Sequence, residues 1–552
     1  MATKPDLDSR RDQMFPKLTP AQIETARRFA SGEPRHFEPG ETMFALGERN
    51  VPSWLVLEGS IEVVRRDGLG NEAPIVTHCP GQISGEINQL GGRATLAEGV
   101  AGAQGCTALP FDAEHLRALL IGSADLGELI MRAFILRRVG LINADHVGSV
   151  LVGAPEDPDL VRIQGFLTRN GYPNQTIDAD TQEGRELLDK LGVPAADLPL
   201  MICPNGTVLK RPTDADAAAC LGITPELDTN KIYDVIVTGA GPAGLATAVY
   251  GASEGLSVLV LDTRAFGGQA GASARIENYL GFPTGISGQA LAGRAFTQAT
   301  KFGAELAIPL TVERLHCDEA SEDGGFAVDL SDGSTVRSRT IVIASGARYR
   351  RPDVDKLEEL EGAGISYWAS PIEAKLCAGE EVALVGGGNS AGQACVFLAP
   401  QVKKINMIVR RPLEATMSKY LIDRIKALPN VEMHVGKEVV ALDGNRASGL
   451  EGVTFRCRTT GTEHRCELNH LFLFIGADPN TDWLDGCVDL DDKGFVITGG
   501  DQRAPLETSR KGVFAAGDVR CGSTKRVAAA VGEGAAVIAQ IHAFLAQEVT
   551  GA

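Results

Sequence analysis

The sequence has 552 residues and eleven cysteines, but no two cysteines are separated by only two residues. Dithiol redox sites and zinc knuckles commonly use that C-x-x-C spacing, so the sequence predicts neither a redox pair nor a metal site. We expect the cysteines to be buried or unreactive thiols in a reducing compartment.

Positive charge and long apolar runs are also scarce. The 53 lysines and arginines face 71 aspartates and glutamates, and the net charge of −18 would repel nucleic-acid phosphates and anionic membranes. No run approaches the ~18 apolar residues of a membrane span, and residues 1–14 are polar rather than signal-like. These absences predict a cytoplasmic protein with no membrane span and no nucleic-acid partner, acting on small molecules or proteins.

The composition, with 44% hydrophobic and 22% charged residues, is typical of a soluble globular protein. Domains usually have about 100 to 200 residues, so a chain of this length should contain several. The motifs described next therefore belong to separate folding units.

Residues 15 to about 120 alternate short β-type runs with glycine turns, which predicts a small antiparallel roll followed by a helical stretch at 112–143. The turn at Gly40, the Glu58 strand turn, and Glu86 followed by Arg93 resemble the cyclic nucleotide-binding domains of the catabolite activator family. The resemblance implies that Glu86 binds the ribose 2′-hydroxyl and Arg93 the cyclic phosphate.

The phosphate segment departs from that family in length. Only six residues separate Glu86 from Arg93, fewer than the family normally carries. The alternative is a ligand-free module for dimerisation or docking. No helix-turn-helix pattern follows, so transcription control is not predicted.

Residues 148–225 predict a β-α-β-α-β-β order with Pro199 just before a strand. This pattern resembles the glutaredoxin and thioredoxin fold, in which that proline is cis and the first loop carries the redox cysteines. The corresponding loop, residues 153–158, contains no cysteine. A scaffold or partner-binding role is therefore predicted for this unit.

The strongest motif begins at residue 233, where an apolar strand leads into Gly239, Gly241 and Gly244 and then a helix. Glycines in this G-x-G-x-x-G spacing let a pyrophosphate approach the amino terminus of a helix, where backbone N–H groups favour anions. A second strand ends at Asp262, which is placed to bind an adenosine ribose. The segment predicts a dinucleotide-binding domain.

A second motif lies near the other end of the chain. Residues 512–518 form an apolar strand that stops at Asp518, and Lys525 and Arg526 precede a helix that starts at about Val527. This resembles the second FAD motif of flavoproteins with two dinucleotide-binding domains, in which the aspartate contacts the ribityl chain. The two motifs together predict one FAD.

Residues 231 to about 545 resemble thioredoxin reductase as a whole. The resemblance rests on the two motifs above and on the segments 266–269, 277–279 and 344–346 between them. It implies the following FAD-binding residues: Gly239, Gly241, Pro242, Ala243, Gly244, Asp262, Gly268, Gln269, Asn278, Ala344, Ser345, Gly346, Gly517, Asp518, Lys525, Arg526 and Val527.

A second glycine motif is nested inside the first domain. A strand at 381–385 leads into Gly386, Gly388, Asn389, Ser390 and Ala391, and the next strand ends in Arg410 and Arg411. Guanidinium groups bind a 2′-phosphate that a carboxylate would repel, so NADPH is predicted, with NADH as the alternative. A third arginine usual in the reductases is not matched, and two arginines on a solvated turn remain an alternative.

The redox disulfide of thioredoxin reductase has no counterpart here. The matching stretch is 366–371, with Trp368 and Pro371 near the cysteine positions, and thiol–disulfide exchange needs an attacking thiolate that this stretch lacks. Trp368 is a candidate lid over the flavin; a packing role is the alternative.

The predicted fold is α/β: two nested Rossmann-like domains preceded by a β-roll and a thioredoxin-fold domain. Predicted boundaries are 15–147 for the β-roll with its helix, 148–225 for the thioredoxin-like unit, 231–348 and 478–547 for the FAD domain, and 349–477 for the NADPH domain. A homodimer is expected by resemblance alone.

Three functions remain open at this stage. The leading one is hydride transfer from NADPH to FAD and then to a non-disulfide acceptor such as a quinone, oxygen or a carrier protein. The second is a flavin- and NADPH-dependent sensor with little turnover. The third is a thioredoxin-disulfide reductase that works through another protein's cysteines.

Overall fold

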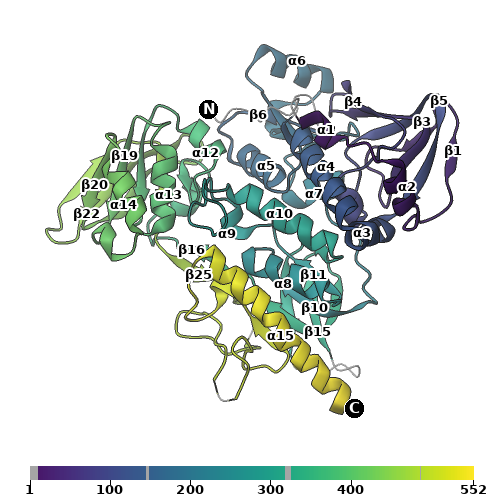
Figure 1. Ribbon diagram of the computed structural model, residues 1–552. Helices are drawn as coiled ribbons and strands as arrows, with labels where there is room; N and C mark the ends of the chain where they lie inside the picture. Colours follow the sequence, from purple (N-terminus) through teal and green to yellow (C-terminus); the bar gives the residue numbers. More distant parts are fainter. Residues whose placement is uncertain (1–9, 144–147, 318–324, 485, 501, 552) are drawn as a thin grey trace.

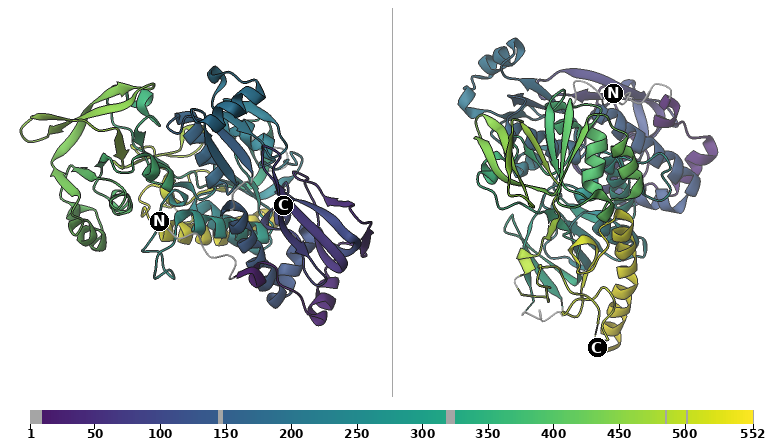
Figure 2. Two further views of the ribbon diagram at one scale, coloured as in Figure 1. Left: turned by 90° about the horizontal axis from the view of Figure 1, so that it is seen from above. Right: turned by 90° about the vertical axis from the view of Figure 1, so that its left-hand side faces the viewer.

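The computed structural model describes residues 10–143, 148–317, 325–484, 486–500 and 502–551 (Figure 1). The FAD domain lies at the centre of the molecule. The β-roll, in purple, and the NADPH domain, in green, lie on opposite sides of it in both Figure 1 and the left view of Figure 2. The thioredoxin-like domain lies beside the β-roll.

The amino-terminal domain is the predicted antiparallel roll, with strand order β1-β5-β3-β4 and β2 paired to β5. The predicted helix at 112–143 is two helices, because Ser123 adopts an extended conformation and ends the first one. The elements are α1 (Arg11–Met14), α2 (Pro20–Arg27), β1 (Arg35–Phe37), β2 (Thr42–Phe44), β3 (Ser53–Arg66), β4 (Glu72–His78), η2 (Ile87–Gly91), β5 (Glu98–Phe111), α3 (Ala113–Gly122) and α4 (Ala124–Asn143).

The second domain has the β-α-β-α-β-β order predicted from the sequence. Its sheet order is β7-β6-β8-β9, with β6 parallel to β7 and the other pairs antiparallel, and the Leu198–Pro199 peptide is cis. The elements are β6 (Ser149–Gly153), α5 (Pro158–Arg169), β7 (Asn174–Asp178), α6 (Gln182–Leu191), η3 (Ala195–Asp197), β8 (Leu200–Ile202), β9 (Val208–Lys210) and α7 (Asp214–Leu221).

The FAD domain is built on a parallel sheet in the order β12-β11-β10-β15, with β26 also paired to β15 and β14 and β13 extending it in antiparallel fashion. The elements are β10 (Ile232–Thr238), α8 (Pro242–Ser253), β11 (Val258–Leu261), α9 (Gly268–Gly271), α10 (Gly288–Lys301), β12 (Glu305–Ala307), β13 (Val312–His316), β14 (Phe326–Leu330), β15 (Thr335–Ile343), η5 (Asp482–Leu484), β26 (Val513–Ala515), η6 (Gly517–Val519) and α15 (Val527–Gly551).

The NADPH domain has a second parallel sheet in the order β17-β24-β18-β19-β20, and the chain enters and leaves it through the antiparallel pair β16 and β25. The elements are β16 (Ala347–Tyr349), α11 (Leu357–Leu360), β17 (Ile365–Ser366), α12 (Pro371–Leu376), β18 (Glu381–Val385), α13 (Asn389–Leu398), β19 (Lys404–Val409), η4 (Leu413–Ala415), α14 (Lys419–Lys426), β20 (Val431–Val435), β21 (Lys437–Asn445), β22 (Gly449–Cys457), β23 (Glu463–Cys466), β24 (His470–Leu473) and β25 (Ala477–Pro479).

The carboxy-terminal helix α15 bears on the expected absence of a membrane span. Its segment Val527–Gln547 is long and apolar enough to cross a membrane by length and composition. A search for an unbroken apolar run misses it, because Glu533 and other polar residues interrupt the segment. The core helix of a soluble protein meets the same criterion; 28% of this window is buried, and one side of α15 places Val537, Ile538 and Ile541 in the hydrophobic core of the FAD domain.

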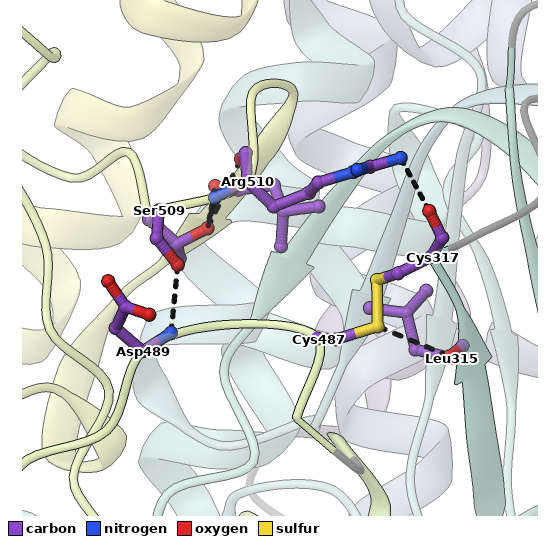
Figure 3. Close-up of a disulfide and its surroundings, with 8 residues drawn as sticks. Leu315, Cys317, Cys487, Asp489, Ser509 and Arg510 are labelled. Atoms are coloured by element: carbon purple, nitrogen blue, oxygen red, sulfur yellow. Dashed lines mark hydrogen bonds between the residues drawn. A yellow bond between two sulfur atoms is a disulfide. The ribbon is translucent and has the colours of Figure 1, made fainter.

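The expectation that the cysteines are buried or unreactive thiols was wrong for four residues. Cys203 is bonded to Cys220 within the thioredoxin-like domain, and Cys317 is bonded to Cys487 at the edge of the FAD domain. Figure 3 shows the second bond, with Arg510 donating from Nη2 to the Cys317 carbonyl oxygen. The partners are 17 and 170 residues apart, so no local spacing pointed to either pair.

Candidate flavin site

A cavity of about 950 Å³ lies at the carboxyl ends of the parallel strands of the FAD domain. This is the edge where open α/β sheets bind their ligands. Every residue predicted to bind FAD lines the cavity except Gly244 and Gly517. Segments that lie almost three hundred residues apart in the sequence therefore meet around one elongated site.

Gly244 and Gly517 contribute to packing below the cavity. A Cβ added at Gly244 would lie 1.8 Å from the Gly239 carbonyl oxygen, and one added at Gly517 would lie 2.8 Å from Cβ of Ala243. Both positions let the start of α8 approach the strands closely.

The amino terminus of α8 faces the cavity with its backbone donors. Gly241 is the N-cap and supplies no side-chain acceptor, so the first N–H groups of α8 stay available to an anion. Gly268 packs directly on this turn, since a Cβ added there would lie 3.1 Å from Cα of Gly241. The turn fits a pyrophosphate.

Asp262 lies at the carboxyl end of β11, where a ribose-binding acid is expected. Its carboxylate accepts hydrogen bonds from the backbone N–H of Ala240 at 2.8 Å, Arg264 at 3.0 Å and Ala265 at 3.1 Å. Burial raises the pKa of Asp262, and these hydrogen bonds oppose the increase. The bonds hold the carboxylate against the glycine turn.

Asp518 and Lys525 line the other end of the predicted FAD site. Burial raises the pKa of Asp518, with Lys525 opposing the increase and Glu533 adding to it. Burial lowers the pKa of Lys525, whose Nζ donates to the Asp518 carbonyl oxygen and, at 2.7 Å, to Ser523 Oγ. A cation and a carboxyl group thus face the cavity just before α15.

The NADPH domain closes onto the same cavity. Asn389 and Ser390, the first residues of α13, line the cavity together with Gln393. Tyr349 lines the cavity beside them; burial raises its pKa, the Ser390 side chain opposes the increase, and the nearby Asp518 carboxylate adds to it. The amino terminus of α13, the helix of the predicted NADPH motif, therefore faces the flavin site directly.

The rest of the predicted NADPH motif forms the turn before α13. Gly386 has φ +143°, and a Cβ there would lie 2.4 Å from the Phe474 carbonyl oxygen. Gly388 is the N-cap of α13 without a side-chain cap, and Ala391 is buried beneath it. This geometry fits a pyrophosphate as the α8 turn does.

Arg410 and Arg411 follow β19, as predicted, and both are exposed. Within the described ranges, no carboxylate lies at ion-pair distance from either guanidinium. Their charge is available to a phosphate group on this side of the domain.

Trp368 lines the cavity, as the candidate lid over the flavin requires, but its side-chain contacts lie at the end where the adenosine would bind. Its ring centroid is 5.9 Å from Cζ of Arg264, and its Nε1 donates to Glu373 at 2.8 Å. Arg264 belongs to the turn that follows Asp262, at the adenosine end of the site. A position over the flavin ring stays a prediction.

No cysteine is among the described residues that line the cavity. Cys377 and Cys395 lie nearby in the sequence but are buried in the NADPH domain. Burial raises the pKa of the Cys377 thiol to about 11 and that of the Cys395 thiol to about 12, so neither forms a thiolate readily.

The β-roll contains a separate cavity of about 220 Å³, which Glu86 lines and Arg93 does not. Glu86 accepts from the Asn88 N–H at 3.1 Å and forms an ion pair with Arg138 at 3.3 Å. Arg93 instead donates to the Leu306 carbonyl oxygen of the FAD domain at 2.7 Å. The structure does not bring the two residues predicted for a cyclic nucleotide into one site.

Several residues of the flavin cavity were not predicted from the sequence. Tyr349, Gln393 and Asn480 lie in segments without a recognisable motif, although β16 and β25 border the predicted domain boundaries. Arg169 was missed because it belongs to the thioredoxin-like domain, outside the segment that resembles a reductase.

Comparison with known proteins agrees with this geometry. The family model for pyridine nucleotide-disulphide oxidoreductases matches residues 233–534, and that for cyclic nucleotide-binding domains matches residues 34–122. The thioredoxin reductase of T. acidophilum has a similar structure, with a TM-score of 0.52 and 31% identity over 56% of this chain and 98% of that one.

Two curated relatives match beyond the reductase segment. One component of the alkyl hydroperoxide reductase of Escherichia coli is 32% identical over 386 residues, covering 68% of this chain and 72% of that protein. A protein named NADH dehydrogenase from Ferdinandcohnia aciditolerans is 29% identical over 401 residues, covering 72% of this chain and 74% of that one. The chain therefore belongs to the pyridine nucleotide-disulphide oxidoreductase family and is an NAD(P)H-dependent flavoprotein oxidoreductase.

Proposed function

We propose that this flavoprotein oxidises NADPH and passes the electrons to a non-disulfide acceptor, such as a quinone, oxygen or a carrier protein. The observation that carries the proposal is the composition of the flavin cavity: Tyr367 and Trp368 line it, and no cysteine does among the described residues. Thiol–disulfide exchange requires a thiolate at the site of electron transfer.

Bound FAD supplies the redox chemistry, taking hydride from the coenzyme and releasing electrons to the acceptor. The protein's residues position the two cofactors. Asn389 and Ser390, at the amino terminus of α13, line the flavin cavity together with Tyr349. This supports a coenzyme held with its reactive end beside the flavin.

The names of the relatives point in two directions. The T. acidophilum protein is named a thioredoxin reductase, whereas the F. aciditolerans protein is named an NADH dehydrogenase, a name without a disulfide substrate. The cavity without cysteines favours the second type of acceptor. Reduction of a disulfide through another protein's cysteines is the alternative.

An anaerobic reduction experiment tests the proposal. Purified protein is mixed with NADPH while flavin absorbance is followed, and a quinone, air or a small disulfide is then admitted separately. We expect rapid bleaching and reoxidation by the quinone or by air. Reoxidation by the disulfide would contradict the proposal.

A sensor is the second candidate. It is favoured by the contact between the β-roll and the FAD domain, where the Arg93 guanidinium lies 4.8 Å from the Phe296 ring centroid and donates to Leu306. A ligand in the β-roll cavity could act on the flavin through this contact. Bleaching that no acceptor reverses would support the sensor.

We also propose that Arg93 docks the β-roll rather than binding a cyclic phosphate. A cyclic nucleotide in the β-roll cavity would have to use Arg11, Arg65 or Arg137, which line it, for its phosphate. Calorimetric titration of the full chain with cyclic AMP tests this. Binding that Arg93→Gln abolishes would overturn the docking role. The predicted homodimer and cytoplasmic location stay predictions.

A further inference from the structure

Arg169 is the last residue of α5 in the thioredoxin-like domain, yet it lines the flavin cavity of another domain. Its Nη2 donates to the Gly268 carbonyl oxygen at 2.8 Å. Gly268 packs against Gly241, because a Cβ added at Gly268 would lie 3.1 Å from Cα of Gly241. The guanidinium therefore lies beside the turn that opens α8.

The nearby Asp262 carboxylate only partly offsets the charge of Arg169. No ion pair to Arg169 occurs in the part of the chain that the structure describes, and its Nε is buried without a hydrogen-bond partner. Burial lowers the pKa of Arg169, Arg264 adds to the decrease, and Asp262 opposes it. A half-buried cation whose buried Nε has no partner is costly unless a ligand supplies an acceptor.

Other groups already hold this end of α5 in place. Gln289 Nε2 donates to the carbonyl oxygens of Thr168 at 3.1 Å and Arg169 at 3.0 Å. Asn170 Nδ2 donates to the Arg264 carbonyl oxygen at 2.9 Å. Figure 1 shows α5 beside α9 and α10, in agreement with these contacts. Docking of the domain thus uses backbone carbonyls and leaves donors of the Arg169 guanidinium free for a ligand.

We propose that the thioredoxin-like domain completes the FAD site, with Arg169 binding the pyrophosphate of the cofactor opposite the amino terminus of α8. A guanidinium presents planar N–H donors that match phosphate oxygens, and the dianionic pyrophosphate supplies the missing countercharge. This assigns a function to a thioredoxin-like domain whose first loop has no redox cysteine: it retains the flavin.

The test compares variants of the full-length holoprotein. Flavin fluorescence after serial dilution gives the FAD dissociation constant, and displacement by added ADP probes the diphosphate site without the flavin ring. We expect Arg169→Met to raise the dissociation constants of FAD and ADP by about 10- to 100-fold, as for the loss of a charge-assisted hydrogen bond. Arg169→Lys keeps the charge but loses the planar pair of N–H donors, so it should raise both dissociation constants by a smaller factor.

Gln289→Ala is the matched control, because it removes two docking hydrogen bonds without touching the cavity lining. Unchanged FAD and ADP binding in Arg169→Met, or an equal loss in Gln289→Ala, would overturn the proposal and leave Arg169 a docking residue. Far-UV circular dichroism checks that each variant is folded. Where Arg169→Met does not fold, the proposal depends on Arg169→Lys, and wild-type binding of FAD and ADP by that variant would overturn it.

Discussion

Ser345 and Asn480, which are 135 residues apart in the chain, exchange two hydrogen bonds at the flavin cavity. Ser345 Oγ donates to the Asn480 carbonyl oxygen at 2.7 Å, and Asn480 Nδ2 donates to the Ser345 carbonyl oxygen at 2.9 Å. The pair lies next to β16 and β25, where the chain enters and leaves the NADPH domain. It therefore ties this two-strand connection, which we call the hinge, to the flavin site.

Asn480→Ala should loosen this hinge. The variant loses one side-chain hydrogen bond, worth about 1 kcal/mol, and leaves the Ser345 carbonyl oxygen without that donor. For a domain of this size, we expect the variant to release its flavin on heating at a temperature about 2 to 4 °C below that of the wild type. Flavin fluorescence measures the release. Asn469→Ala is the control, since its side chain forms an exposed 3.4 Å contact with Glu380; an equal shift there would contradict the hinge role.

Arg410 and Arg411 should determine the choice of coenzyme. Replacing both with glutamine removes two cations that would face a 2′-phosphate, so KM for NADPH should rise about 10- to 100-fold while KM for NADH changes little. Steady-state kinetics with each coenzyme measures this. Arg456→Gln serves as the control, because it removes a partly exposed guanidinium of the same domain that is already paired with Glu438. An equal loss for NADH would show that Arg410 and Arg411 do not recognise the phosphate.

The two disulfides can be checked by counting thiols. The denatured, unreduced protein should present seven thiols and the reduced protein all eleven. Disulfides are uncommon in reducing compartments, so seven thiols in protein isolated from its native cells would argue against the expected cytoplasmic location. Eleven thiols before reduction would show that neither bond has formed.

The flavin site was predictable from the sequence because its signals are local. Strand, glycines, helix and terminal acid follow one another within thirty or so residues around Gly241 and Asp262, and each has a physical reason to be there. Asp518 was found in the same way. The structure brings these separate segments to one cavity.

The residues that the sequence did not reveal depend on contacts between domains. Arg169 reaches the cavity only because α5 docks on the FAD domain, and nothing around Arg169 in the sequence encodes that docking. Arg93 fits a phosphate-binding pattern, yet its guanidinium contacts Phe296 and Leu306 of another domain. A local motif gives the residue type but not the direction of a long side chain.

A substitution at Trp368 tests whether the indole controls access of the electron acceptor to the flavin. If the indole covers the flavin, Trp368→Ala should change quinone turnover about 2- to 10-fold, the worth of an aromatic stacking contact, while anaerobic reduction by NADPH stays near the wild-type rate. Stopped-flow absorbance separates the two half-reactions. Equal changes in both would count against the lid.

The contacts of Trp368 define the competing outcome. Its ring lies against Arg264 at the adenosine end, and its Nε1 donates to Glu373. Trp368→Phe keeps an aromatic ring and loses only the second contact, so under the lid hypothesis it should retain most of the quinone turnover. If Trp368→Ala instead weakens FAD binding and leaves both half-reactions unchanged, the indole supports the adenosine end of the site and does not control access of the acceptor.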